Sequence, residues 1–325
     1  MLSDYDRSKL KVVALAGGVG GAKMVDGLTR VLPPENLTVI VNTGDDFEYL
    51  GLTICPDLDT VCYTLAGVAD PVNGWGRVNE SWRALETIEL LGGPTWFRLG
   101  DYDLGLHLER TRLQREGQTL SQITQHFRQV WGIRPMILPM SDQAVPTWVD
   151  TAQGEMQFQE YFVHRQCQPA VTGFRFQDVE TAHPAPGVLD ALNSADLVVI
   201  CPSNPWVSIG PILAIPGIRQ AMEAREVVAI SPIIAGKAVK GPAAKMYAEL
   251  GLEPSAESVA RQYGNLLDGF LIDNLDADQV REIQTLGVRT CVTDTLMKTT
   301  QDRVRLGKEV VAFGLSLSDN SFESA

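Results

Sequence analysis

The sequence predicts an α/β protein: a Rossmann-like, doubly wound, mostly parallel sheet that carries a helical insertion. Short, almost continuously apolar segments recur along the chain, as expected for parallel strands that helices cover on both faces. Segments with helical spacing alternate with them, which is typical of a doubly wound sheet. In the middle of the chain three helical segments follow one another without a strand, which indicates an insertion. The predicted strands are residues 11–16, 37–42, 196–201, 226–230, 269–273 and 288–292.

The predicted helices follow these strands in order. The first strand ends in glycines, and residues 22–32 then place apolar side chains at helical spacing. Pro242 suits the first turn of a later helix, where the N–H that proline lacks has no partner in any case. The other helices of the predicted core are residues 216–225, 242–250, 277–286 and 300–312.

The insertion is predicted to be helical, and Thr119 or Ser121 can cap its last helix. Beyond it, residues 156–163 alternate between apolar and polar like a half-exposed strand. The insertion's helices are predicted at residues 80–91, 104–116 and 120–131. The resulting division is a core of residues 10–70 and 134–313, an insertion at 75–132 and a flexible tail at 314–325.

Composition narrows the possible partners. A chain of 325 residues with 45% hydrophobic and 21% charged residues can bury a substantial core. The formal net charge of −13 repels nucleic acid and anionic membranes, so neither is expected as a partner. A phosphate site on such a protein has to be built from backbone N–H groups, local Lys or Arg side chains, or a metal ion.

The cysteines and the start of the chain indicate a cytoplasmic protein. The five cysteines form no CxxC pair and no zinc-like group with the four histidines, which favours a reducing compartment. Residues 1–10 are polar and charged, unlike a signal peptide. No apolar segment approaches the ~20 residues that span a bilayer.

A glycine-rich turn between the first strand and the first helix is the first candidate site. Glycines let the backbone approach an anion closely, and the start of a helix offers oriented N–H donors. The spacing fits neither GxGxxG nor GxxxxGK[ST], and a tight turn that packs helix against strand is the structural alternative. Four glycines in five residues favour nucleotide phosphate binding by Gly17, Gly18, Gly20, Gly21 and the neighbouring Lys23.

Acidic residues follow the second strand and precede the next helix. Asn42, Asp45 and Asp46 come directly after the second strand, where open α/β sheets bind ligands. Asp57 and Asp59 lie at the start of a helix that runs through residue 65, so either one could simply be its N-cap. A cluster of Asp45, Asp46 and Asp59 would suit Mg²⁺, which prefers oxygen ligands. The alternative for residues 42–46 is a solvated turn.

Two polar loops and one Arg–Asp loop complete the candidates. Ser203, Asn204 and Ser208 follow one predicted strand, and Gly236 and Lys237 follow the next, so both loops can contact a nucleotide at the same sheet edge. The alternative for each is a proline-stiffened connection.

The Arg98–Asp101 loop carries little specificity by itself and could equally be a surface ion pair. His107 lies one helical turn after Asp103, a spacing usually found in surface contacts.

Taken together, these segments resemble the 2-phospho-L-lactate transferase family of coenzyme F420 biosynthesis, and its bacterial branch more than its archaeal one. The match extends over about residues 11–313. The motifs that carry it, in family order, are AGGVGGAK, VNTGDD, ICPDLDT, GWGR, RLGD, ILPMSD, PSNPWVSIGPI, SPIIAGKAVKGPAAK and TDTLM. Tyr102 stands where many members have Arg after RLGD, so a contact with substrate there can differ.

The resemblance implies a Mg²⁺-dependent phosphotransferase. In this family the ribityl hydroxyl of the deazaflavin Fo attacks the phosphorus nearest the acid in a guanosine diphosphate ester of a three-carbon acid, 2-phospholactate or phosphoenolpyruvate, and GMP leaves. The resemblance also implies GDP or GTP binding and a homodimer. Lactyl, enolpyruvyl and glyceryl donors differ by few atoms, so the acid stays open, as does the selectivity for guanine.

Residue by residue, Asp59 and Arg98 match positions that the family associates with the deazaflavin. The glycine turn and the loop of Ser203, Asn204 and Ser208 match its nucleotide side. We therefore expect Asp59 and Asp45 to be catalytic and to hold the metal, although base and metal ligand are not separable for Asp59. Asn42, Asp46, Arg98 and Asp101 are expected to bind substrate beside Asp59.

Two other functions compete with this one. Regulatory proteins that bind nucleotide sugars share the glycine turn and TGDD, but ICPDLDT and RLGD are not expected in them. An NAD(P)-dependent oxidoreductase fits poorly because GxGxxG is absent and no acidic residue ends the second strand as such enzymes require.

Overall fold

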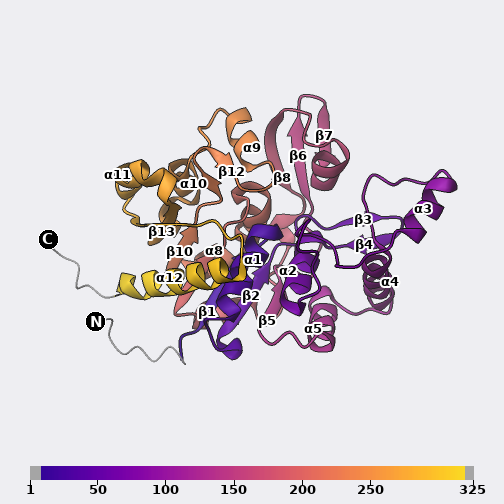
Figure 1. Ribbon diagram of the computed structural model, residues 1–325, viewed down its shortest axis with the longest axis horizontal. Coiled ribbons are helices and arrows are strands. Elements are labelled where there is room, and N and C mark those ends of the chain that lie inside the picture. The colour runs from indigo at the N-terminus through magenta and orange to yellow at the C-terminus, as the bar shows by residue number, and fades with distance from the viewer. Residues whose placement is uncertain (1–8, 319–325) are drawn as a thin grey trace.

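The computed structural model describes residues 9–318 and has a seven-stranded, wholly parallel sheet at its centre (Figure 1). The predicted α/β class with a Rossmann-like sheet is therefore confirmed. The strands in spatial order are β14 (Arg289–Thr293), β13 (Gly269–Asp273), β10 (Glu226–Ile230), β9 (Leu197–Ile200), β1 (Val12–Ala16), β2 (Leu37–Val41) and β5 (Met136–Pro139).

The order of the strands fixes where a ligand can bind. Numbered in chain order within this sheet, the first strand is an inner strand, with the second on one side and the fourth on the other. This is the order of a dinucleotide-binding fold extended by one strand. The chain therefore reverses direction across the sheet between β1 and β9. In open α/β sheets the crevice at the carboxyl ends of two such strands is the usual binding site.

Helices bury both faces of the sheet, which is why β1, β9 and β13 are buried at every residue. One face packs against α1 (Gly18–Thr29), α2 (Pro56–Ala66) and α12 (Thr300–Ser318). The other face packs against α6 (Val188–Ser194), α8 (Ile218–Met222), α10 (Ala256–Tyr263) and α11 (Val280–Gln284).

The helical insertion forms an arm beside the sheet, at the right of Figure 1. It contains α3 (Arg83–Leu90), α4 (Asp101–Arg115) and α5 (Leu120–Val130), preceded by the hairpin β3 (Phe47–Tyr49) and β4 (Leu52–Ile54). Thr119 caps α5 in a capping box with Gln122, as predicted. The hairpin was not predicted. It packs its aromatic residues Phe47 and Tyr49 against Trp96.

A small antiparallel sheet after the insertion corrects one prediction. Its strands are β7 (Gly154–Gln157), β6 (Thr147–Thr151) and β8 (Val171–Phe176). The predicted strand at 156–163 is wrong beyond Gln157, because the chain enters a π-helical turn at Glu160–His164. Phe158 and Tyr161 are both buried, and their spacing of three residues is helical.

The remaining elements lie mainly in loops at the carboxyl ends of the strands. They are α7 (Gly210–Ala214), α9 (Ala243–Glu249), β11 (Ile233–Ile234), β12 (Lys237–Ala238) and short turns at Pro34–Asn36, Val179–Thr181, Pro205–Ile209, Gly264–Leu266 and Asn274–Gln279. Pro242 is the N-cap of α9, one residue before the predicted helical turn. The predicted flexible tail is wrong for 314–318, which continue α12; residues 319–325 lie outside the described residues. Over residues 9–318 no helix combines the length and apolarity that a membrane span needs.

Candidate functional site

The candidate site lies at the carboxyl ends of β1, β2 and β9, where the chain reverses across the sheet. Gly17 follows β1 and Ser203 follows β9, and the two are joined by reciprocal hydrogen bonds. The Gly17 N–H donates to Ser203 Oγ over 3.1 Å, and Ser203 Oγ donates to the Gly17 carbonyl over 2.8 Å. A Cβ on Gly17 would lie 2.6 Å from both Asp57 Oδ2 and Ser208 Cβ. The predicted glycine turn and the predicted polar loop are therefore in direct contact.

The glycines belong to the first turn of α1, because the helix begins at Gly18 and not at residue 22. A Cβ on Gly20 would lie 2.4 Å from the Pro202 carbonyl oxygen, and one on Gly21 would lie 2.7 Å from Ser203 Oγ. Close packing thus explains these glycines, as the structural alternative expected. It also brings the backbone of the helix start to the surface that faces the crevice, without a side-chain cap and without an acidic residue in the first turn.

Asn42 organises two buried carboxylates at the end of β2. Its Nδ2 donates to Asp45 Oδ1 over 3.0 Å, to Asp57 Oδ2 over 2.9 Å and to the Val207 carbonyl over 3.2 Å. Its Oδ1 accepts the Gly44 N–H over 2.8 Å, which bends the loop. Asn42 is fully buried, so one amide holds the carboxylates from two loops side by side.

These carboxylates are short of positive charge. Burial, followed by the negative charge of Asp57, raises the pKa of Asp45 well above its usual range. Burial likewise raises the pKa of Asp46 well above its usual range and that of Asp57 to about 6. Asp46 Oδ1 and Asp59 Oδ2 are buried and accept no hydrogen bond within residues 9–318. A bound cation would relieve the repulsion between Asp45 and Asp57.

Asp59 has a different partner from Asp45. It forms a buried ion pair with Arg110 of α4, and His107 Nδ1 lies 3.7 Å from its Oδ2. His107 Nε2 in turn lies 3.4 Å from Asp103 Oδ1, which accepts the Tyr63 hydroxyl over 2.5 Å. His107 is only 2% exposed, so the predicted surface contact with Asp103 is a buried one. Burial raises the pKa of Asp59, and the Arg110 charge opposes that rise.

The Arg98–Asp101 loop is held by neighbouring parts of the insertion. The Arg98 guanidinium lies 4.3 Å from the centre of the Trp82 ring, a cation–π contact on an exposed surface. Asp101 accepts from Ser81 Oγ over 2.5 Å and from the Ala84 N–H over 3.1 Å, and these hydrogen bonds lower its pKa. Asp101 therefore ties α4 to the start of α3 and does not pair with Arg98.

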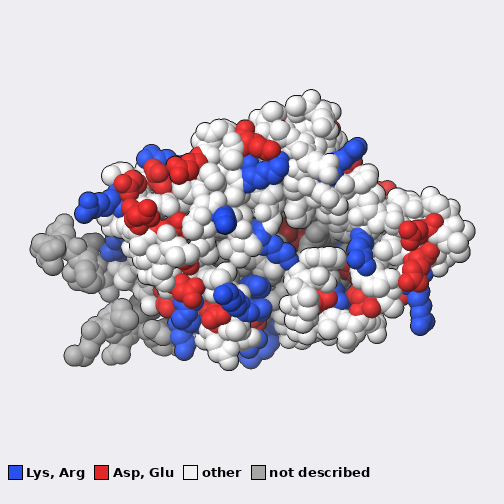
Figure 2. Space-filling view, turned by 45° about the horizontal axis from the view of Figure 1, so that its top comes forward, with Lys and Arg blue, Asp and Glu red and all other residues white. Residues whose placement is uncertain are grey.

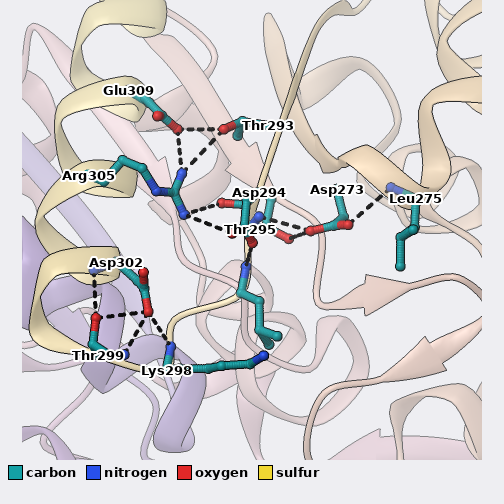
Figure 3. Close-up of polar contacts among 11 residues, drawn as sticks. Asp273, Leu275, Thr293, Asp294, Thr295, Lys298, Thr299, Asp302, Arg305 and Glu309 are labelled. Atoms are coloured by element: carbon teal, nitrogen blue, oxygen red, sulfur yellow. Dashed lines mark hydrogen bonds and ion pairs between the residues drawn. The ribbon is translucent and has the colours of Figure 1, made fainter.

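Lys23 is held by the loop that follows β14. Figure 3 shows the polar contacts of that loop. Its Nζ donates to the Met297 carbonyl over 3.1 Å. Asp273 fixes that loop by accepting from the Thr295 N–H and hydroxyl. Arg305 of α12 fixes it further by donating to the Asp294 carbonyl over 2.6 Å (Figure 3). The TDTLM segment thus places a carbonyl that orients Lys23 at the glycine turn.

Other predicted nucleotide residues have mainly local contacts. Asn204 Oδ1 accepts the Trp206 and Val207 N–H groups and caps the turn at Pro205–Ile209. Gly236, with φ +73°, and the exposed Lys237 belong to the β11–β12 hairpin, and no contact joins them to the glycine turn within the described part of the chain. Lys240, three residues later, does reach toward that turn.

The acidic side chains fit a Mg²⁺ ion that is also bound by water and phosphate oxygens, and not one that protein ligands alone surround. Among residues 9–318 no group of three or more His, Cys, Asp or Glu side chains is arranged to hold a metal. Mg²⁺ commonly binds one or two carboxylates and completes its shell with water and phosphate oxygens. Asp45 and Asp57 offer two such carboxylates, which both accept from the Asn42 amide. The charge of Asp59 is already compensated by Arg110.

Sequence reasoning missed three residues of this site. The sequence marks Asp57 as a candidate that could also be a helix cap and does not assign it to the metal site, and Val207 contributes through its carbonyl, which no sequence pattern reveals. Arg110 had a signal: with Leu106 and Leu113 it lies on the apolar, core-facing side of α4, where a charged residue needs a partner.

The chain was compared with protein families and with known proteins. The family model described as 2-phospho-L-lactate transferase CofD matches residues 12–311. A phosphoenolpyruvate transferase of Streptomyces griseus subsp. griseus is 44% identical over 90% of this chain and 94% of its own length. A 2-phospho-L-lactate transferase of Methanosarcina acetivorans is 41% identical over 92% of this chain and 98% of its own.

A solved structure supports the fold. A UPF0052 family member from Bacillus halodurans superposes with a TM-score of 0.60 at 15% identity, over 93% of this chain and 99% of that one. At that identity the likeness concerns the fold alone. The family match and the curated relatives extend over nearly the whole chain, and on these grounds the chain belongs to the CofD family of 2-phospho-L-lactate transferases.

Proposed function

We propose that this chain transfers a 2-phospholactyl or enolpyruvyl-phosphate group from a guanosine diphosphate-linked donor to the ribityl hydroxyl of Fo, with Mg²⁺, and releases GMP. The observation that carries the proposal is the contact between the glycine turn and Asp57, because it joins a phosphate-type helix start to a buried acidic pair. The names of the curated relatives support the same class of reaction.

The nucleotide of the donor would lie across the carboxyl ends of β1 and β9. Backbone N–H groups of residues 19–21 and the Lys23 ammonium can bind its phosphates. Ser203 and Ser208 pack directly against Gly17, so they shape the wall of this subsite. The Gly18 N–H already donates to Asp57, so a phosphate bound here would face a carboxylate.

Asp45 and Asp57 would hold Mg²⁺, which when bound neutralises charge on the transferring and leaving phosphates. Asn42 keeps both carboxylates in place before the ion arrives, so little reorganisation accompanies binding. Asp46 lies close enough to Asp57 and Asp59 for their charges to raise its pKa further, and it can accept hydrogen bonds from metal-bound water.

Asp59 would orient the attacking hydroxyl. Its Oδ2 is the unused acceptor, while its Oδ1 is fixed by Arg110. The hydroxyl oxygen forms the new bond to phosphorus, the bond from that phosphorus to the bridging oxygen breaks, and GMP leaves with the bridging oxygen. The proton of the hydroxyl passes to Asp59 or to water. Most of the rate gain then comes from alignment and charge neutralisation.

The deazaflavin side would be formed by the insertion. Arg98 lies on Trp82, and Asp101 and Tyr102 follow it at the start of α4.

Figure 2 shows a hollow near the centre of one face of the molecule, with Lys and Arg side chains along its border and acidic atoms inside it. A hollow with both charges suits an anionic donor that binds together with a cation.

The test is an assay of the purified chain with Fo, Mg²⁺ and each guanylylated acid, following product mass and GMP. We expect Fo-dependent GMP formation with one donor, and loss of at least ~100-fold of that rate in Asp59→Asn with the fold intact. The exposed variant Arg112→Gln is the control. If no donor gives turnover and a nucleotide sugar binds saturably, the chain is instead a regulatory binding protein of the same fold.

A further inference from the structure

Two lysines from distant parts of the chain lie near the glycine turn. Lys23 belongs to α1 and is half-buried, and Lys240 follows the β11–β12 hairpin. Each ammonium is held by one backbone carbonyl: that of Met297 for Lys23 and that of Asn73 for Lys240. Within residues 9–318 neither lysine forms an ion pair with a carboxylate. In a chain with net charge −13, two adjacent unpaired cations need a reason.

The backbone around Gly74 shows how close the two lysines are. A Cβ on Gly74 would lie 3.4 Å from Lys240 Nζ and 3.0 Å from Val19 Cγ1. Val19 is in the first turn of α1, and Lys23 follows it by four residues on the same side of the helix. The segment 70–78 therefore lies over the glycine turn, and Lys240 joins it to that turn.

The arrangement leaves the positive charges of Lys23 and of the exposed Lys240 without a compensating anion. Burial lowers the pKa of Lys23, and the charge of Arg303 adds to this effect. Packing around the ammonium lowers the pKa of Lys240, and the charge of Lys23 lowers it further. Like charges repel, and a carbonyl oxygen carries only a partial negative charge to offset the repulsion. An anionic ligand with more than one charge would offset both.

We propose that Lys23 and Lys240 act together as a clamp for two linked phosphates, which makes this site prefer a nucleoside diphosphate over a monophosphate. The inference rests on the proposed function, in which the donor is a diphosphate ester. Lys23 takes the phosphate next to the helix start, and Lys240 exchanges its bond to the Asn73 carbonyl for the second phosphate. Segment 70–78 then stays in place over the ligand through Gly74 and Val19.

The clamp also accounts for product release. The reaction leaves one phosphate on the nucleotide and the other on the deazaflavin product. Once the bond between them is broken, GMP can satisfy only one of the two lysines, so it is held more weakly than the donor was. The same residues would then serve both donor affinity and turnover.

Binding of GDP, GMP and inorganic pyrophosphate tests the clamp by calorimetry at fixed salt, without Fo. For Lys240→Met we expect the affinity for GDP and pyrophosphate to fall about tenfold and that for GMP less than about twofold. Lys308→Met, which removes an exposed lysine of α12, is the matched control and should change none of them. The plot of log affinity for GDP against log salt should also become shallower in Lys240→Met.

Equal losses for GDP and GMP, or no loss for either, would overturn the clamp. Denaturant unfolding of Lys240→Met guards against a folding defect, and Lys240→Arg should retain most of the preference for GDP. Failure of the two proposals can be told apart. Fo-dependent GMP release with an unaltered GDP preference in Lys240→Met rejects the clamp alone. A Lys240-dependent GDP preference in a chain without that turnover rejects the transferase reaction alone.

Discussion

One buried arginine, Arg110, holds Asp59 in the candidate site. Arg110 is 1% exposed, pairs with Asp59 and also lies 3.1 Å from His107 Nδ1. Isolated charges are expensive to bury, and the Arg110 guanidinium compensates the buried charge of Asp59. The pair ties α2, which carries Asp59, to α4 of the insertion. The residue that fixes Asp59 thus comes from outside the sheet.

Replacing Arg110 by Met should lower the free energy of unfolding by about 3–5 kcal/mol, because Asp59 is left as a buried, uncompensated carboxylate. Urea unfolding at pH 7.5 measures the change. Arg112→Met is the matched control on the same helix: Arg112 pairs with Glu109 and Glu116 on the exposed side, so its loss should leave the free energy of unfolding nearly unchanged.

The double variant Asp59→Asn with Arg110→Met gives the sharper test. If the two residues act as a pair, the double variant should lose clearly less stability than the sum of the single variants. Strict additivity would show that Arg110 stabilises α4 by packing alone. Arg110 itself could not be placed in the site from sequence, because charged residues at helical spacing usually face solvent and its partner is 51 positions away.

At the scale of elements, close packing fixes the turn at the proposed nucleotide site. Gly17 is the extended residue before α1, and it is enclosed by Asp57 and Ser208. Its conformation is open to any residue, so only the lack of space demands glycine there. The loops after β1, β2 and β9 are consequently packed directly against one another.

Gly17→Ala should weaken nucleotide binding at least about tenfold and lower stability by about 1–3 kcal/mol, because the new methyl group displaces Asp57 or Ser208. GDP titration and urea unfolding measure the two effects. Gly105→Ala is the control: its Cβ would meet nothing within 4 Å inside α4, so stability should rise by up to about 1 kcal/mol. Unchanged GDP affinity in Gly17→Ala would mean that the turn does not line the nucleotide site.

The strands that helices cover on both faces were predictable. Five of the six apolar segments became such strands, and the sixth became the partly exposed edge strand β14. The edge strand β5 was not predicted: it has a 38% exposed Met136 at one end and Pro139 at the other, which mask the pattern. The π-helical turn at Glu160–His164 was predicted as a strand because apolar and polar residues alternate there, although its buried residues follow helical spacing.

Over the whole molecule, the site separates its charges. Carboxylates from the loops after β2 gather on one side of the glycine turn, and Lys23 and Lys240 lie on the other. A chain with net charge −13 repels an anionic donor from a distance, so affinity has to come from this local arrangement. Without a bound cation, the buried carboxylates Asp45 and Asp57 repel each other. Sites arranged for function commonly lower stability in this way.

That repulsion predicts how stability depends on pH. Burial raises the pKa of Asp57 from 3.8 to about 6, so the ionised form is disfavoured in the folded chain. The penalty is fully present above pH 6, shrinks as the pH falls from 6 toward 4, and vanishes once Asp57 is protonated in both states. In EDTA, Asp57→Asn should therefore be more stable than the unsubstituted chain by about 2 kcal/mol at pH 8 and equally stable near pH 4.

Denaturant unfolding at pH 8, 6 and 4.5 measures this difference, and Asp70→Asn is a control with the same change in net charge. Asp70 is exposed and accepts the Val72 and Asn73 N–H groups, which lower its pKa. The stabilisation that it provides is present at high pH and is lost as the pH falls, the reverse of the expectation for Asp57. With Mg²⁺ added, the unsubstituted chain should recover the stability that Asp57→Asn gains without it, because only the former keeps both carboxylates for the ion. An Asp57→Asn variant that is less stable at pH 8 would mean that the carboxylate is already compensated, and the case for a cation beside Asn42 would fail with it.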